Sequence, residues 1–103
     1  MMEQIERIRL MESHLDAAVV AIEELSAALE KYIAVQPRMR ALDEYLDSGE
    51  WRRDYDADEA GLLPADLKRG VLSEDGLFNV LDDSSQLNIH MLETVTTILK
   101  GDI

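Results

Sequence analysis

The stretch that decides the fold is residues 8–33, which read IRLMESHLDAAVVAIEELSAALEKYI. It keeps a strict seven-residue repeat with two seam positions in every repeat. One position holds Ile8, Leu15, Ile22 and Leu29, and the other holds Met11, Ala18, Leu25 and Tyr32. Alternating spacings of three and four residues place both sets on a single face of a helix. The repeat therefore predicts one long amphipathic helix, which we place over residues 3–35.

Two arrangements would cover the apolar face of this helix. Later helices of the same chain can pack back along it as a bundle, or two chains can pair as a coiled-coil homodimer. Because later helices are available, the bundle is favoured and the homodimer remains the alternative. The predicted fold class is all-α, with the long N-terminal helix in an antiparallel helical bundle of three main helices. We expect one domain over residues 1–103.

Pro37 is predicted to end or kink the long helix. Proline has no N–H to donate, and it pushes the residue before it out of the helical region. The same residue type suits the first turn of a helix. The sequence therefore predicts a second helix over residues 37–47.

Two serines predict where the later elements begin. Ser48 is placed to cap a short helical stretch that runs through Tyr55. From there to residue 72 the chain is predicted to be irregular, so residues 48–72 form an acidic strap that lies against the helices. Ser73 is predicted to cap the last helix, residues 73–100, and is followed by two acids that suit a helix N-terminus, Glu74 and Asp75.

Charge and composition restrict the classes of partner. The chain has 22 acids and 10 bases, a net charge of −12, and residues 43–83 carry −9 of it. Such a surface is repelled by phosphate backbones, so we expect no nucleic-acid partner. No apolar run approaches the roughly 18–20 residues that cross a bilayer, so we expect no membrane partner. The absence of cysteine excludes disulfides and favours a cytoplasmic location.

The acids at Asp54, Asp56 and Asp58 are similar to the opening of a calcium-binding loop. The match then fails, because the sixth position is Glu59 instead of glycine and the twelfth is Ala65 instead of glutamate. A divalent-cation site in an acidic loop over residues 54–59 is therefore the weaker interpretation. A solvated or ion-paired loop is the stronger one.

The sequence offers little for catalysis. No serine or threonine stands in a nucleophile motif, and cysteine is absent. His90 and Glu93 lie one helical turn apart, but a di-metal bundle needs several such pairs. We expect neither an enzyme nor a cofactor.

Trp51 is the sole tryptophan and lies in the acidic strap near Tyr55. In one interpretation it is a core anchor that holds the strap against the long helix, and this is preferred. In the other it is a hot spot on a protein-binding surface, where tryptophan, tyrosine and arginine dominate.

Residues 48–75, SGEWRRDYDADEAGLLPADLKRGVLSED, carry a resemblance to a known family. The string resembles a family of short acidic bacterial proteins catalogued as a domain of unknown function, and the likeness extends over about residues 3–95. It implies a bacterial, cytoplasmic, helical protein and supplies no activity. It also implies that a set of residues forms one structural or functional unit: Trp51, Asp54, Tyr55, Asp58, Gly61, Pro64, Lys68, Arg69, Gly70, Ser73 and Asp75.

These observations together predict a non-enzymatic protein-interaction module that presents an acidic surface to a basic or amphipathic protein partner. The divalent-cation module is one alternative. A small secretion chaperone or immunity-type binding protein is another, which small size and low pI permit.

Overall fold

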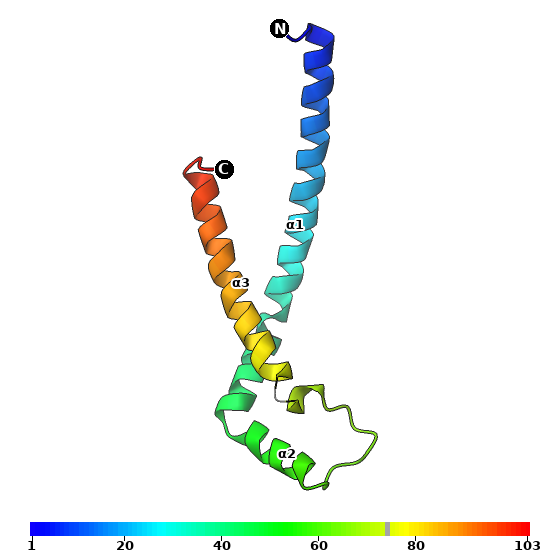
Figure 1. Ribbon diagram of the computed structural model, residues 1–103, viewed down its shortest axis with the longest axis vertical. Coiled ribbons are helices and arrows are strands. Elements are labelled where there is room, and N and C mark those ends of the chain that lie inside the picture. The colour runs from blue at the N-terminus through cyan, green and yellow to red at the C-terminus, as the bar shows by residue number, and fades with distance from the viewer. Residues whose placement is uncertain (74) are drawn as a thin grey trace. The chain divides into compact units, whose positions relative to one another are not determined.

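The computed structural model of the chain describes residues 1–73 and 75–103 (Figure 1). Its elements in chain order are α1 (Gln4–Asp47), α2 (Glu50–Glu59), the 3-10 helix η1 (Gly70–Leu72) and α3 (Gly76–Leu99). The predicted all-α class and the long N-terminal helix are confirmed. Glu74, which the sequence places behind the cap of the last helix, lies outside the described residues.

The chain divides into two compact units. The first, Met1–Pro37, holds the N-terminal part of α1. The second, Arg38–Ile103, holds the end of α1 together with α2, η1 and α3. That residues 1–103 form a single domain stays a prediction.

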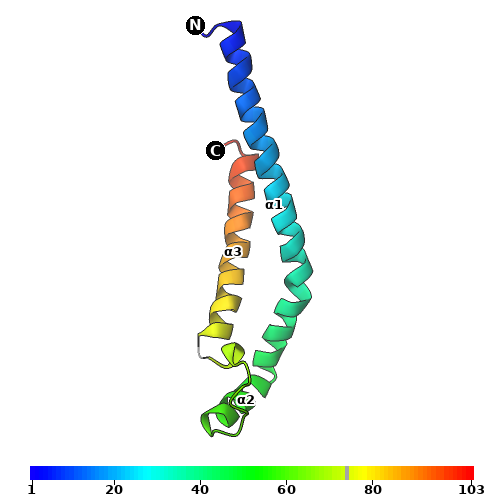
Figure 2. The same ribbon diagram turned by 90° about the vertical axis from the view of Figure 1, so that its right-hand side faces the viewer.

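The predicted break at Pro37 is wrong, because α1 continues through this residue as one helix to Asp47 (Figure 2). A proline inside a helix removes a single N–H and so leaves only the carbonyl of Ile33 without its usual donor. One residue earlier, the Gln36 side chain donates from Nε2 to the Tyr32 carbonyl at 2.8 Å. Helical residues on both sides carry the helix across the missing bond. The two predicted helices, 3–35 and 37–47, are therefore one.

The short helix of the strap is longer than predicted and includes most of its acids. The N-cap of α2 is Gly49 and not Ser48 as predicted, although the Ser48 hydroxyl accepts from the Glu50 N–H at 3.2 Å. The helix then runs to Glu59 instead of stopping at Tyr55. It ends where Gly61 adopts φ 71°, with Leu62 N–H bonded to the Ala57 carbonyl. This pair of features is the Schellman ending, which favours glycine because an L side chain is strained at positive φ.

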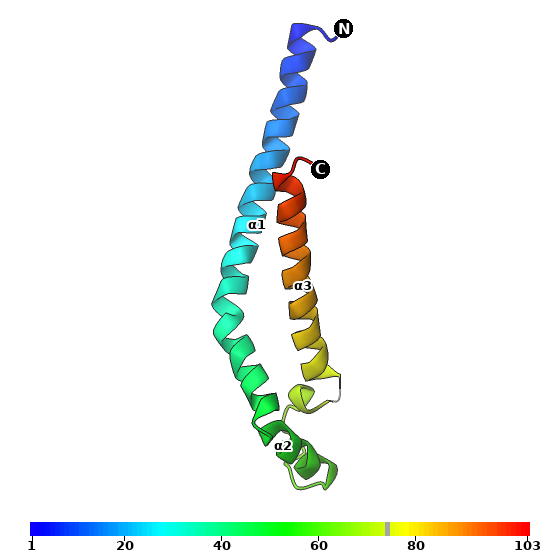
Figure 3. The same ribbon diagram turned by 90° about the vertical axis from the view of Figure 1, so that its left-hand side faces the viewer.

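Helix α3 begins three residues later than predicted and runs without a break (Figure 3). Ser73 itself is extended, with φ −67° and ψ 144°, because η1 ends just before it. Its hydroxyl still accepts from the Gly76 N–H at 3.0 Å, so the serine serves the first turn from a distance. Residues 82–85, where the apolar pattern is interrupted, are helical.

Backbone contacts between elements, within the part of the chain that is described, join η1 to α2 and η1 to α3. The 3-10 helix therefore links the two α-helices that follow α1. Among the same residues, no helix is both long and apolar enough to span a lipid bilayer.

Candidate functional site

Trp51 is at the centre of the small core in residues 38–103. It is 6% exposed and clusters with Leu72, 6% exposed, and Leu77, 2% exposed. Partly buried residues from the end of α1, from α2, from the segment after α2 and from α3 pack around them: Leu42, Tyr45, Leu46, Tyr55, Leu63 and Leu81. A side chain this enclosed has the position of a core anchor.

The indole of Trp51 makes directed contacts as well as apolar ones. Its Nε1 donates to the Val71 carbonyl at 2.8 Å, which joins α2 to η1 across 20 residues. Tyr55 stacks on the indole with ring centroids 5.2 Å apart, and Phe78 meets it edge-on at 5.5 Å. Buried tryptophans usually satisfy their N–H in this way. Two predicted members of the family unit, Trp51 and Tyr55, therefore stack on one another, and the indole also bonds the residue that follows a third, Gly70.

Arg69 closes the irregular segment between α2 and η1. Its Nε lies 3.0 Å from Asp58 Oδ1, and its Nη2 donates to the carbonyls of Leu63 and Pro64. The Nε–H does not point at the carboxylate, so the Asp58 contact is an ion pair and not an aligned hydrogen bond. Pro64 and Arg69, both predicted members of the unit, are thus direct partners. The guanidinium has a structural task.

Tyr45 and Asp54 connect the end of α1 to α2. The Tyr45 hydroxyl donates to Asp54 Oδ2 at 2.5 Å. Burial, and then the hydrogen bond to Asp54 and the charges of Asp54 and Glu50, raise the pKa of Tyr45 to about 12. All of these influences disfavour the phenolate. The tyrosine therefore remains a hydrogen-bond donor over the whole physiological pH range.

Ser73 ties η1 to the start of α3. Its hydroxyl donates to the Gly70 carbonyl at 2.8 Å and accepts from the Gly76 N–H at 3.0 Å. A Cβ on Gly76 would overlap the Gly70 carbonyl oxygen and lie 2.5 Å from Ser73 Oγ. Only glycine fits at residue 76. Sequence reasoning missed this residue, because a close approach between segments leaves no periodic signal.

The acids of the 54–59 string lie on helix α2 and not in a loop, which corrects the loop interpretation. Asp54 accepts from Tyr45, Asp56 pairs with Arg52 at 3.4 Å, and Asp58 pairs with Arg69. Successive residues two apart point in nearly opposite directions on a helix, so the three carboxylates do not converge. Within residues 1–73 and 75–103, no group of three His, Cys, Asp or Glu side chains could hold a metal ion.

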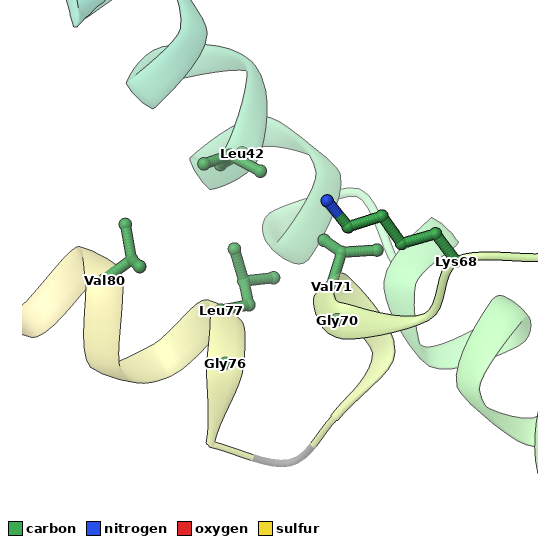
Figure 4. A pocket seen from close by; sticks show the side chains of 7 residues that line it. All are labelled: Leu42, Lys68, Gly70, Val71, Gly76, Leu77 and Val80. Atoms are coloured by element: carbon green, nitrogen blue, oxygen red, sulfur yellow. The ribbon is translucent and has the colours of Figure 1, made fainter.

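A shallow hollow of about 410 Å³ opens beside η1 (Figure 4). Its walls are apolar apart from Lys68, whose side chain extends over the same opening. The lining residues are Leu42, Lys68, Gly70, Val71, Gly76, Leu77 and Val80. An apolar side chain of a partner would fit such a surface, with Lys68 at its edge.

The larger apolar surface belongs to the first unit. Eight side chains on α1, called here the apolar seam, are 45% to 69% exposed: Ile8, Met11, Leu15, Val19, Ile22, Leu25, Leu29 and Ile33. No residue of α1 is buried. Contiguous apolar surface of this extent marks an interaction site in most proteins. The seam is therefore the strongest candidate for recognition.

The predicted unit residues have definite places around the core. Gly61 ends α2, Lys68 borders the hollow, and Asp75 gives the first helical carbonyl of α3, bonded to the Asn79 N–H at 2.9 Å. The structure brings most of the set together as a scaffold around Trp51. It separates this scaffold in sequence from the apolar seam, which holds none of these residues.

The comparisons with known proteins agree with the resemblance that the strap predicted. The family described as "Domain of unknown function (DUF4298)" matches residues 8–94. No curated protein and no solved structure matches the chain. The match covers most of the 103 residues and includes both the apolar seam and the strap. The chain belongs to this family, the domain of unknown function DUF4298.

Proposed function

We propose that the chain is a non-enzymatic protein-interaction module whose recognition surface is the apolar seam of α1. The observation that carries this proposal is the exposure of eight large apolar side chains along one helix face. Covering each of them would contribute about 1–2 kcal/mol, since they are roughly half exposed. The seam is also the surface that would complete the predicted antiparallel bundle, once helices lie along it.

The strap is the scaffold in this proposal and not a reactive site. Several polar side chains in the strap and next to it are engaged: Asp54 with Tyr45, Asp58 with Arg69, and Ser73 with Gly70 and Gly76. Groups held in such contacts are poorly placed to act as general acids, bases or nucleophiles. The acidic residues 43–83 give the module a surface that attracts a basic or amphipathic protein in a cytoplasmic setting.

No contact of the strap favours the divalent-cation alternative, because Asp54, Asp56 and Asp58 face different partners. The secretion-chaperone and immunity-type alternatives share the seam as their contact surface. They differ from the proposal only in the identity of the partner.

Photo-crosslinking in living cells tests the proposal. A photoreactive amino acid replaces Ile22 on the seam or, as the matched control, Val20 on the opposite face of the same helix. Both native residues are β-branched and exposed, 68% and 52% respectively. We expect irradiation to link the position 22 variant, and not the position 20 variant, to a second polypeptide that mass spectrometry identifies. If neither position links to another chain, the proposed function is wrong.

A further inference from the structure

The sides of the apolar seam are uncharged along most of its length. In the heptad notation that places Ile8 and Met11 at positions a and d, the flanking positions are e and g. Between residues 15 and 36 these positions hold only apolar or small residues and one serine: Val19, Ala21, Ser26, Ala28, Ile33 and Val35. Charged e and g residues normally select the partner of a coiled coil. Here the face has no charge to match against a foreign helix.

We propose that the partner on the apolar seam is a second copy of this chain. This inference rests on the proposed function and names its partner. A seam that contacts its own equivalent satisfies the two-fold symmetry of most homo-oligomers, because the same patch serves both chains. The eight seam side chains, each about half exposed, offer roughly 800 Å², the usual area per partner of a stable interface.

The distribution of charge supports a second copy over a basic partner at this surface. Residues 1–42 carry a net charge of −2, whereas residues 43–83 carry −9. A basic partner would be drawn to the second region, and the seam has no acidic side chains at its edges beyond Glu12 to hold it. Two identical chains that meet along the seam approach through a part of low net charge. Like-charge repulsion is weaker there than at residues 43–83.

The width of the face indicates that the pair is not a bare two-helix coil. Two-stranded coils bury a narrow stripe of a and d residues, whereas a bundle also buries e or g residues. Val19 and Ile33 of the seam, and Val35 beside it, lie outside the a and d stripe, so they are buried only where the contact between the two copies is wider than in a two-stranded coil.

Light scattering on the purified full chain measures the assembly directly. Three proteins are compared over a hundredfold range of concentration: the native chain, Ile22→Glu on the seam and Val20→Glu on the opposite face. The native chain and V20E should have a mass of at least twice 11.6 kDa. The I22E chain should have the mass of one chain, because a carboxylate buried in the apolar seam would have no cation or hydrogen-bond donor to offset its desolvation. Trp51 fluorescence serves as the fold control, since the core around the indole lies in residues 38–103.

Three outcomes overturn the inference. The first is a single-chain mass for the native chain at every concentration. The second is dissociation of the assembly by V20E and not by I22E. The third is an assembly that stays intact in both variants. The result also separates the inference from the proposed function. If the purified chain is a monomer and position 22 still links to another protein in cells, self-association alone is wrong. If it is a monomer and position 22 links to nothing, both self-association and the proposed function are wrong.

Discussion

Residues 1–37 and residues 38–103 differ in how far they bury their apolar side chains. The first unit is one helix whose apolar side chains remain about half exposed. The second encloses one indole in a small core and holds it by a hydrogen bond to the Val71 carbonyl. The first leaves its apolar face exposed, whereas the second makes its own core. Under the proposed self-association, substitutions should therefore act on assembly in one region and on local stability in the other.

The largest effect is expected from Trp51→Ala, which should unfold residues 38–103. Truncating a buried tryptophan costs roughly 3–5 kcal/mol, and this core has few other buried residues to share the loss. Thermal denaturation followed by circular dichroism should show the lost transition. Trp51→Phe keeps the ring contacts and loses only the donor to Val71, so its loss should be smaller. Equal melting temperatures for the native chain and Trp51→Ala would contradict the core role of the indole.

Gly76→Ala should destabilise the same unit by about 1–3 kcal/mol, because the added Cβ overlaps η1. The matched control is Gly70→Ala, where an added Cβ meets no atom within 4 Å. That variant should change the free energy of unfolding by no more than about 0.5 kcal/mol. Urea denaturation of both variants measures the difference. If the two alanines behaved alike, the close approach at residue 76 would have no energetic importance.

A smaller effect is expected from high pH, and it should be confined to the second unit. The pKa of Tyr45 is raised to about 12 in the folded chain, whereas an unfolded tyrosine titrates near 10. The folded state therefore holds the proton more tightly. The stabilisation is fully present below pH 10 and is lost as the pH rises from about 10 to about 12.

The measurement for Tyr45 is urea unfolding at several pH values between 8 and 11. Stability of the native chain should fall more steeply than that of Tyr45→Phe, which has no proton to lose at this position. Parallel slopes for the two proteins would mean that the contact with Asp54 does not persist in solution.

The smallest effect is expected from divalent cations. Calcium or magnesium at millimolar concentration should change neither the Trp51 fluorescence nor the melting temperature of the native chain. Asp54, Asp56 and Asp58 are engaged with Tyr45, Arg52 and Arg69 and do not converge. A saturable shift that Asp56→Asn abolishes would reopen the cation interpretation and place function in the second region.

The sequence predicts the structure correctly where it depends on the spacing of apolar residues. It does not predict contacts between residues that are distant in the sequence. The heptads of residues 8–33 predict α1, because a helix face is a property of spacing alone. Ser48 and Ser73 lie close to the two helix starts, and each accepts from the first helical N–H, but the N-caps are Gly49 and Asp75. The continuation of α1 through Pro37 was not predicted, because proline was expected to end or kink the helix. The helical residues on both sides maintain the helix although one N–H donor is missing.

The site was predicted as a group of residues but not as a set of contacts. The family resemblance collected Trp51, Arg69 and Ser73 into one unit, yet their partners are the Val71, Pro64 and Gly70 carbonyls. Backbone acceptors have no sequence signature, so no pattern could have named them. Ion pairing of the acidic string was predicted, but the pairing of Asp58 with Arg69 was not, because the string offers many carboxylates for each base.

The hydrogen bond between Trp51 and Val71 has a consequence for the rate at which the chain folds. The hydrogen bonds of Arg69 to Pro64 and of Ser73 to Gly70 join near neighbours, whereas this one closes a loop of 20 residues. Closing a loop of this length takes well under a millisecond, and chains dominated by local contacts fold fast. Residues 38–103 should therefore fold fast, without requiring the apolar seam to meet another helix.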